Sequence, residues 1–227
     1  MINQYSIIYF NFMQVKIPPD FGFYGILTGP LRGYEYLTEI LVAREIAFVQ
    51  LRVKDAPPEL IAPIALKMLR LTEGTKTKLI INDDPDLAVR VQADGVHIGQ
   101  NDMPFREARK IVGEKAVIGI STHTVSQVEQ VCAVSPDYIG IGPVFPTPTK
   151  KVPDPVIGIE TMRAMLAAAT VPAVAIGGIT LENLPDVLRG GARNFCMVRP
   201  LNQSREPEKV LKEIVRIYGD FNNLRGI

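Results

Sequence analysis

The chain has 227 residues, of which 47% are hydrophobic and 22% are charged, and its formal net charge is +1. This usage is typical of a soluble globular protein that buries a sizeable core. The near-neutral charge argues against a nucleic-acid or membrane partner held by bulk electrostatics, and no apolar run approaches the roughly 20 residues that cross a bilayer.

The first regular pattern begins after an extension of residues 1–20. The extension contains the apolar run Ile7–Phe10, but no basic segment precedes this run, so we do not expect a signal peptide. An extra strand or a packing arm is the expectation. Cys132 and Cys196 lie far apart in apolar patterns, which favours buried free thiols in a reducing cytoplasm.

From Phe23 onward, short β-rich runs alternate with segments of helical length. The predicted strands are residues 23–28, 48–52, 78–82, 95–98, 116–120, 137–141, 172–176 and 194–198. The predicted helices span about 36–46, 57–71, 85–91, 104–112, 124–133, 159–169, 180–190 and 206–218. Thr124 and Thr180 are predicted helix caps, and Gly190–Gly191 is a predicted helix stop.

Eight strand–helix repeats with nearly continuous apolar strands predict a parallel sheet covered by helices. Eight such units close naturally as a (β/α)8 barrel, an α/β fold. A doubly wound open sheet is the main alternative, although no GxGxxG follows the first strand as its dinucleotide-binding form requires. We expect a single barrel domain over residues 21–220 and a short tail over residues 221–227.

Gln50, Arg52 and Lys54 alternate at the end of the second predicted strand. A period of two puts their side chains on one face, pointing inward at the barrel mouth. Two cations and an amide are costly there unless they meet an anion. A ladder of salt bridges at a sheet edge is the alternative interpretation.

Carboxylates follow the next two predicted strands. Asn82 and Asp83 end the third strand, and Asp102 follows the fourth. Neighbouring strands of a barrel bring such side chains together, and two carboxylates beside a phosphate suit Mg²⁺. Helix caps are the commoner explanation for an isolated Asp.

The fifth strand leads into Ser121 and His123, where the hydroxyl is a candidate substrate ligand and the histidine is either structural or a base. His97 lies in the body of a strand, so we expect it to be structural. After the seventh strand, Gly177–Gly178 is predicted to open a helix and to expose backbone N–H groups to a phosphate.

The loop from Gly142 to Lys151 follows the sixth strand and contains three prolines, so no helix can run through it. It carries the hydroxyls of Thr147 and Thr149 and the ammonium groups of Lys150 and Lys151. A surface loop with solvated lysines is the simpler interpretation. With the neighbouring strand ends, however, the loop lies between two predicted anion sites. That arrangement suggests two phosphorylated substrates that are joined, with diphosphate leaving from the metal side.

These motifs, in this order, resemble the thiamine-phosphate synthase family. They are Gln50–Lys54, Ile81–Asp83, Asp94–Asp102, Gly119–His123, Gly142–Lys150 and Ile176–Ile179. The resemblance implies a (β/α)8 barrel that joins hydroxymethylpyrimidine diphosphate to a thiazole phosphate, releasing diphosphate and giving thiamine phosphate. It leaves open whether the thiazole carries a carboxylate and whether the chain forms a homo-oligomer.

The resemblance also implies roles for individual residues. The residues at positions where the family binds the pyrimidine diphosphate are Gln50, Leu51, Arg52, Val53, Lys54, Asn82, Ser121 and Lys150. The residues at positions where the family binds the thiazole phosphate are Thr147, Pro148, Thr149, Gly178, Val198 and Arg199. Asp83 and Asp102 would bind Mg²⁺ as the cofactor. Arg52, Lys54, Ser121 and Lys150 would serve the chemistry, which is dissociative and needs no strong base.

Three positions depart from the family pattern. Val53 stands where a carboxylate is usual, Asp84 where Arg is usual and Arg199 where Ser is usual. We expect Arg199 to strengthen phosphate binding by a bidentate contact. Two alternatives stay open, a thiazole tautomerase with His123 as its catalytic residue and a non-catalytic binding protein for thiazole or thiamine phosphate.

Overall fold

The computed structural model describes residues 17–148 and 154–224, and strands and helices alternate as predicted as far as residue 195. The strands are β1 Tyr24–Leu27, β2 Phe48–Leu51, β3 Lys78–Asn82, β4 Gly95–Ile98, β5 Val117–Thr122, β6 Tyr138–Ile141, β7 Ala173–Ala175 and β8 Asn194–Phe195. The helices are α1 Tyr34–Ala43, α2 Pro58–Thr72, α3 Pro85–Val91, α4 Phe105–Val112, α5 Val125–Cys132, α6 Gly158–Ala168, α7 Leu184–Arg189, α8 Val198–Asn202 and α9 Pro207–Leu224.

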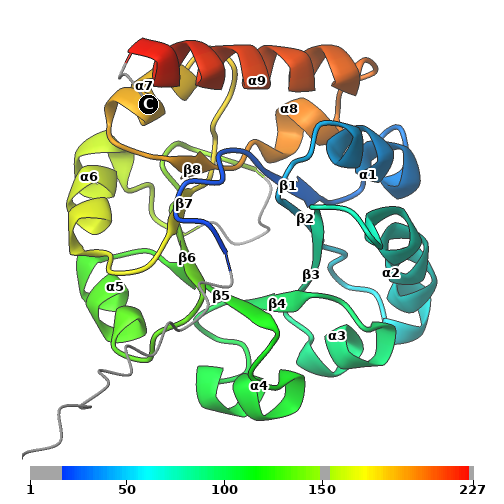
Figure 1. Ribbon diagram of the computed structural model, residues 1–227. Helices are drawn as coiled ribbons and strands as arrows, with labels where there is room; N and C mark the ends of the chain where they lie inside the picture. Colours follow the sequence, from blue (N-terminus) through cyan, green and yellow to red (C-terminus); the bar gives the residue numbers. More distant parts are fainter. Residues whose placement is uncertain (1–16, 149–153, 225–227) are drawn as a thin grey trace, which may run out of the picture.

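The strands form one parallel sheet in the order β1 to β8. A parallel bridge between Phe23 and Phe195 joins the last strand to the first. Figure 1 shows the resulting ring of strands with the helices around it. The predicted (β/α)8 barrel is therefore confirmed, and the open-sheet alternative is wrong.

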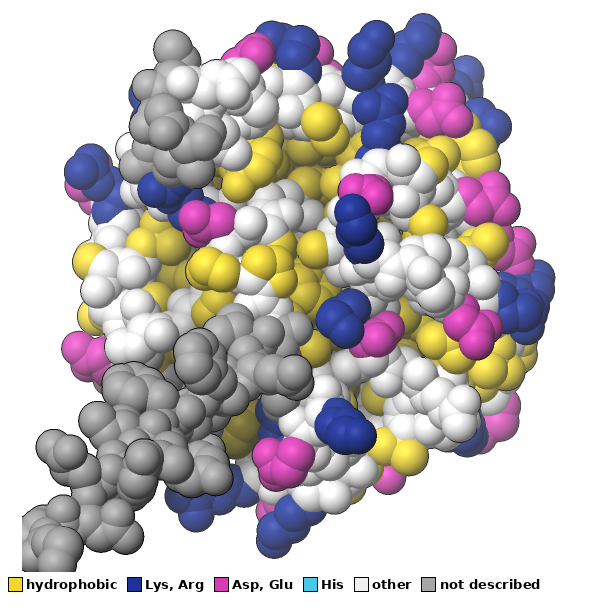
Figure 2. Space-filling model, in the orientation of Figure 1, with side chains coloured by type: hydrophobic (Ala, Val, Ile, Leu, Met, Phe, Trp, Pro, Cys, Tyr) yellow, Lys and Arg dark blue, Asp and Glu magenta, His cyan; other side chains and the backbone are white. Residues whose placement is uncertain are grey.

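Two hydrophobic clusters follow from the alternation of side chains along the strands. Outward-facing residues such as Leu27, Val49 and Ile81 pack with the helices in the larger cluster. Inward-facing residues such as Tyr24 and Phe48 fill the barrel interior in the smaller cluster. Figure 2 shows one face of the molecule, on which Lys and Arg are interspersed with Asp and Glu around apolar side chains.

The chain enters the barrel through a short segment at residues 17–22. Ile17 is 2% exposed and packs with the inward-facing residues at the strand starts, and Figure 1 shows this segment in dark blue crossing the ring. The buried Asn194 holds the segment, because its Oδ1 accepts from the Phe21 N–H at 2.6 Å and its Nδ2 donates to the Pro19 carbonyl at 2.9 Å. Residues 1–16, the rest of the predicted arm or strand, lie outside the described residues.

The structure differs from the sequence prediction after β7. The predicted strand 194–198 stops at Phe195, and an unpredicted helix, α8, begins at Val198. The buried Asn202 explains this helix, because its side chain donates to the Ile26 carbonyl at 2.8 Å and accepts from the Thr28 N–H at 2.9 Å. These bonds tie residues 198–202 to the end of β1.

Helix boundaries also differ, and α1 ends at Ala43 instead of near residue 46. Helix α7 starts at Leu184 instead of Thr180, because the Asn183 side chain organises the preceding turn by accepting from the Thr180 N–H at 2.8 Å. Helix α9 runs to Leu224, past the predicted end at 218 and the expected tail boundary at 221. Its apolar face continues through Phe221, which packs against the larger cluster.

Candidate active site

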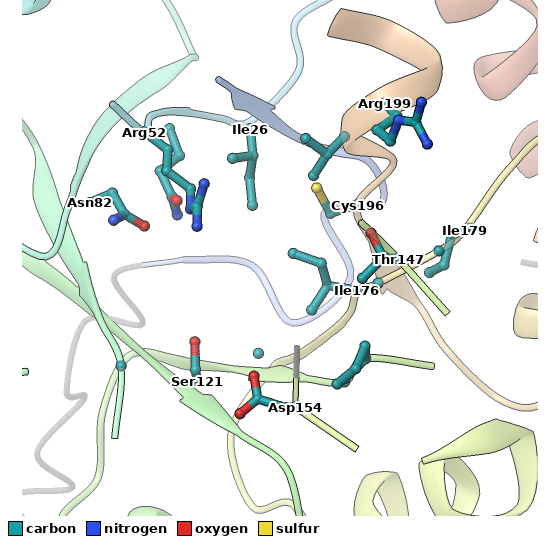
Figure 3. A pocket seen from close by; sticks show the side chains of 18 of the residues that line it. Ile26, Arg52, Asn82, Ser121, Thr147, Asp154, Ile176, Ile179, Cys196 and Arg199 are labelled. Carbon is teal, nitrogen blue, oxygen red and sulfur yellow. The ribbon is translucent and has the colours of Figure 1, made fainter. Parts of the chain in front are cut away.

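A cavity of about 530 Å³ opens among the carboxyl ends of the strands. This is the end at which barrels of this type carry their sites, and the volume lies in the usual range of small-molecule sites. Residues in or after each of the eight strands line it. Figure 3 shows Arg52 and Asn82 on one wall, Arg199 and Ile179 on the opposite wall, and Ser121 and Asp154 on a third side.

The cationic wall is built as the alternating pattern predicts. Gln50, Arg52 and Lys54 all line the cavity. Burial lowers the pKa of Arg52, and the nearby carboxylates of Asp83 and Asp55 oppose this shift. A half-buried guanidinium facing a cavity is a strong binding group for a phosphate.

Leu51 and Val53 belong to the same segment but do not line the cavity. Leu51 is buried in the larger hydrophobic cluster, and Val53 packs against that cluster. Successive residues of a strand point to opposite faces, so the spacing that brings Arg52 inward sends these two outward. The side chains of Leu51 and Val53 therefore do not face the cavity, and their assignment to the pyrimidine diphosphate stays a prediction that only their backbone could fulfil.

Asp83 and Asp102 converge as predicted. Burial and then a hydrogen bond with Asp83 raise the pKa of the Asp102 carboxyl. Lys54 forms an ion pair with Asp83, and the Gly99 N–H donates to Asp102 Oδ2 at 2.7 Å. A Cβ on Gly99 would lie 2.8 Å from the same oxygen, so a side chain there would displace the carboxylate.

This pair fits the donor set of Mg²⁺, which takes oxygen ligands and often only one or two carboxylates beside phosphate and water. Within residues 17–148 and 154–224, no group of three or more His, Cys, Asp or Glu side chains is arranged to hold a metal. Asp84 has a different role, because its side chain caps α3 by accepting from the Leu87 N–H at 2.8 Å.

Ser121 lines the cavity as predicted, and its oxygen points into the open space in Figure 3. The His97 Nε2 atom lies 2.8 Å from Ser121 Oγ. His97 also lines the cavity, although its place in the body of β4 predicted a structural residue. Its inward direction could have been deduced from the alternation with Val96 and Ile98, which pack outward against the helices.

His123 and Asp154 lie side by side on the same side of the cavity. His123 Nδ1 donates to the Gly142 carbonyl at 2.6 Å, and its Nε2 lies 3.7 Å from Asp154 Oδ2. Asp154 was not predicted, because a single acid in a proline-rich segment carries no signal of its own.

The opposite wall combines the loop after β6 with the ends of β7 and β8. Thr147, Pro148, Gly178, Val198 and Arg199 line the cavity there, as predicted. Gly178 has φ +65°, and an added Cβ would lie 2.6 Å from the Pro146 carbonyl oxygen. Only glycine allows the two loops to approach so closely. The pair Gly177–Gly178 lies in a loop well before α7, so its predicted place at a helix start is wrong.

The remaining predicted residues of the loop, Thr149, Lys150 and Lys151, lie outside the described residues. Their roles stay predictions. The described part of the loop is held against β7, since the Val144 N–H donates to the Ile176 carbonyl at 2.9 Å and the Phe145 N–H donates to the Gly177 carbonyl at 3.0 Å.

A family model, curated relatives and a solved structure point to the same family. Residues 29–201 match the family model described as thiamine monophosphate synthase. A thiamine-phosphate synthase of Dictyoglomus thermophilum is 39% identical over 196 residues, covering 86% of this chain and 87% of that protein. A thiamine-phosphate synthase of Caldicellulosiruptor saccharolyticus is 44% identical over 156 residues, covering 69% of this chain and 71% of that protein. The solved structure of a thiamine phosphate pyrophosphorylase from Pyrococcus furiosus aligns with a TM-score of 0.79 at 28% identity, covering 89% of this chain and 98% of that one.

Proposed function

The chain belongs to the thiamine monophosphate synthase family, and we propose that its cavity joins hydroxymethylpyrimidine diphosphate to a thiazole phosphate with the help of Mg²⁺. The protein is a transferase of thiamine biosynthesis, and its substrates are small phosphorylated molecules. One observation carries the proposal for the site. A single cavity has cations and paired carboxylates on one wall and a glycine-lined loop with an arginine on the other.

The two walls suit two anions of different charge. Arg52 and Lys54 form part of the first wall, against which the diphosphate would lie. Asp83 and Asp102 would hold Mg²⁺, which when bound supplies positive charge to the leaving diphosphate. The second wall offers Gly178, Thr147 and Arg199 to the single phosphate of the thiazole.

The bond changes need little from the protein beyond position and charge. The bond between the pyrimidinyl methylene carbon and the diphosphate oxygen breaks, and its electron pair leaves with the diphosphate. The ring stabilises the resulting methylene cation, and the lone pair of the thiazole nitrogen forms the new C–N bond. Arg52 and Lys54 stabilise the charge that develops on the leaving oxygen. Ser121, Asn82 and Gln50 orient the ring for the capture.

The test supplies both substrates, with and without Mg²⁺, and measures diphosphate and thiamine phosphate. We expect equal amounts of the two products, formed only with the metal. Turnover of the thiazole tautomer without thiamine phosphate would reassign the protein as a thiazole tautomerase acting through His123. Binding of the thiazole phosphate without turnover would indicate a non-catalytic binding protein.

Arg199 provides a separate prediction at the thiazole wall. Because a charged hydrogen bond is worth about 1.5–3 kcal/mol, Arg199→Ser should raise the KM for the thiazole phosphate roughly tenfold or more. The KM for the pyrimidine diphosphate should stay within about twofold, since removal of one group at one wall leaves the other wall intact. Steady-state kinetics with each substrate varied in turn measures both values.

The control for this change is Arg205→Ser, which alters an exposed arginine that does not line the cavity. It should leave both KM values unchanged. A rise in the KM for the pyrimidine diphosphate alone in Arg199→Ser would place the two substrates the other way round.

We also propose that the protein works in a reducing cytoplasm. Support comes from Cys132 and Cys196, which are both buried and free. No helix in the described part of the chain is long and apolar enough to cross a membrane.

A further inference from the structure

Five polar side chains form a continuous chain of hydrogen bonds across the interior of the barrel. Gln50 Nε2 lies 3.0 Å from Tyr24 Oη, which lies 2.8 Å from Tyr138 Oη. His97 Nδ1 lies 3.0 Å from Tyr138 Oη, and His97 Nε2 lies 2.8 Å from Ser121 Oγ. Each side chain comes from a different strand, and we call this set the polar relay. Its two ends, Gln50 and Ser121, line the substrate cavity, whereas Tyr24 and Tyr138 do not.

The two tyrosines are neutral phenols in this environment. Both are 1% exposed, and burial raises the pKa of each of them above the ordinary tyrosine range. Each phenol can therefore donate one hydrogen bond through its proton and accept another through its oxygen. The barrel makes room for the ring of Tyr138 at Gly119, where a Cβ would lie 2.0 Å from the Cζ atom of that ring.

The direction of the relay is set at Gln50. Its Nε2 is the atom nearest Tyr24, and an amide nitrogen can only donate. Tyr24 Oη therefore accepts from Gln50 and donates to Tyr138 Oη, which in turn donates to His97 Nδ1. His97 must then carry its proton on Nε2 and donate to Ser121 Oγ. Every hydrogen bond of the relay runs the same way.

We infer that the polar relay sets the hydrogen-bonding polarity of the substrate cavity. With Nε2 held by Tyr24, Gln50 presents its Oε1 to the cavity as an acceptor. With Oγ accepting from His97, Ser121 turns its own proton toward the cavity as a donor. Tyr24, Tyr138 and His97 are thus positioning residues, which act on the substrate through Gln50 and Ser121.

This polarity supplies a physical basis for discrimination between amino- and oxo-substituted rings. An amino-substituted nitrogen heterocycle donates from its amino group and accepts at a ring nitrogen, which matches the two ends of the relay. The corresponding oxo heterocycle accepts at its oxygen and donates from a ring N–H. This pattern would place an acceptor against Gln50 Oε1 and a donor against the Ser121 proton. The inference rests on the proposed function, and it assigns the discrimination between 4-amino- and 4-oxopyrimidine diphosphates to Tyr24, Tyr138 and His97.

The tautomer of His97 tests the relay without any substrate. The chain has only two histidines, so ¹⁵N-histidine labelling gives two rings to assign. At about pH 8, above the ordinary imidazole pKa of about 6.5, we expect His97 with its proton on Nε2. His123 should have its proton on Nδ1, because that atom donates to a carbonyl. A His97 ring protonated on Nδ1 in the wild-type protein would mean that the relay runs in reverse and would overturn the inference.

Tyr138→Phe tests the effect on specificity, because it keeps the ring and removes the central hydroxyl. The matched control is Tyr218→Phe, a tyrosine on α9 whose ring packs against Phe195 far from the relay. The measured quantity is the ratio of kcat/KM for 4-amino- and 4-oxo-5-hydroxymethylpyrimidine diphosphate.

We expect the ratio to fall at least tenfold in Tyr138→Phe, since buried polar groups left unpaired weaken the discrimination that they support. We also expect His97 to show a mixture of tautomers in this variant. Tyr218→Phe should match the wild type in both measurements. A ratio within about twofold of wild type in Tyr138→Phe would overturn the inference. If the wild type forms no thiamine phosphate, the proposed function fails, while the histidine spectrum still decides the direction of the relay.

Discussion

Asp102→Ala should lower kcat/KM for thiamine phosphate formation about 10³-fold and should raise the Mg²⁺ concentration needed for half-maximal activity. The physical reason is the loss of one of two carboxylates that converge at the cation-lined wall. The fold should remain intact, because Asp102 lies in the loop after β4 and belongs to neither hydrophobic cluster. Assays across a range of Mg²⁺ concentrations and a thermal melt measure these effects.

Asp86→Ala is the matched control for this change. Asp86 is an exposed acid in the first turn of α3 and does not line the cavity. We expect wild-type kinetics for this variant. An Asp102→Ala protein with the Mg²⁺ dependence of the wild type would show that the metal binds elsewhere.

Arg52→Lys should lower kcat by about 10²- to 10³-fold, the usual effect of losing a preorganised group that faces developing charge. Lysine keeps the charge but not the planar fork of donors that can hold two phosphate oxygens at once. The guanidinium is positioned by its burial and by the carboxylates of Asp83 and Asp55, so a shorter-reaching point charge cannot replace it. Single-turnover measurements separate this effect on bond cleavage from substrate binding.

Arg44→Lys serves as the control for Arg52→Lys, because Arg44 is exposed at the end of α1 and lies outside the cavity. The KM for the thiazole phosphate should be unchanged in both variants. A kcat for Arg52→Lys within about twofold of the wild-type value would exclude the proposed role of the guanidinium in leaving-group stabilisation.

The sequence was most informative where one local rule decides the direction of a side chain. The alternation along β2 correctly directs Gln50, Arg52 and Lys54 to the cavity. The same rule directs the side chains of Leu51 and Val53 away from the cavity, toward the helices. Strand-end position was sufficient for Asp83 and Asp102, because neighbouring parallel strands end at the same edge of the barrel.

Features that depend on distant partners were not predictable in this way. Helix α8 exists because Asn202 bonds to β1, which is about 175 residues earlier in the chain. Tyr24 and Tyr138 resemble ordinary core aromatics, and their hydroxyl contact spans 114 residues of sequence. Asp154 lies beside His123 in the cavity, a contact that no local pattern predicts.

The most direct test of the two-wall arrangement is a crystal structure with thiamine phosphate, diphosphate and Mg²⁺ bound together. The decisive measurement is the position of the diphosphate in the electron density. We predict that it lies against Arg52, with the metal bound to Asp83 and Asp102, and that the thiamine phosphate group lies at Gly178 and Arg199. A diphosphate at Gly178 and Arg199, with the metal away from both carboxylates, would contradict this account of the site.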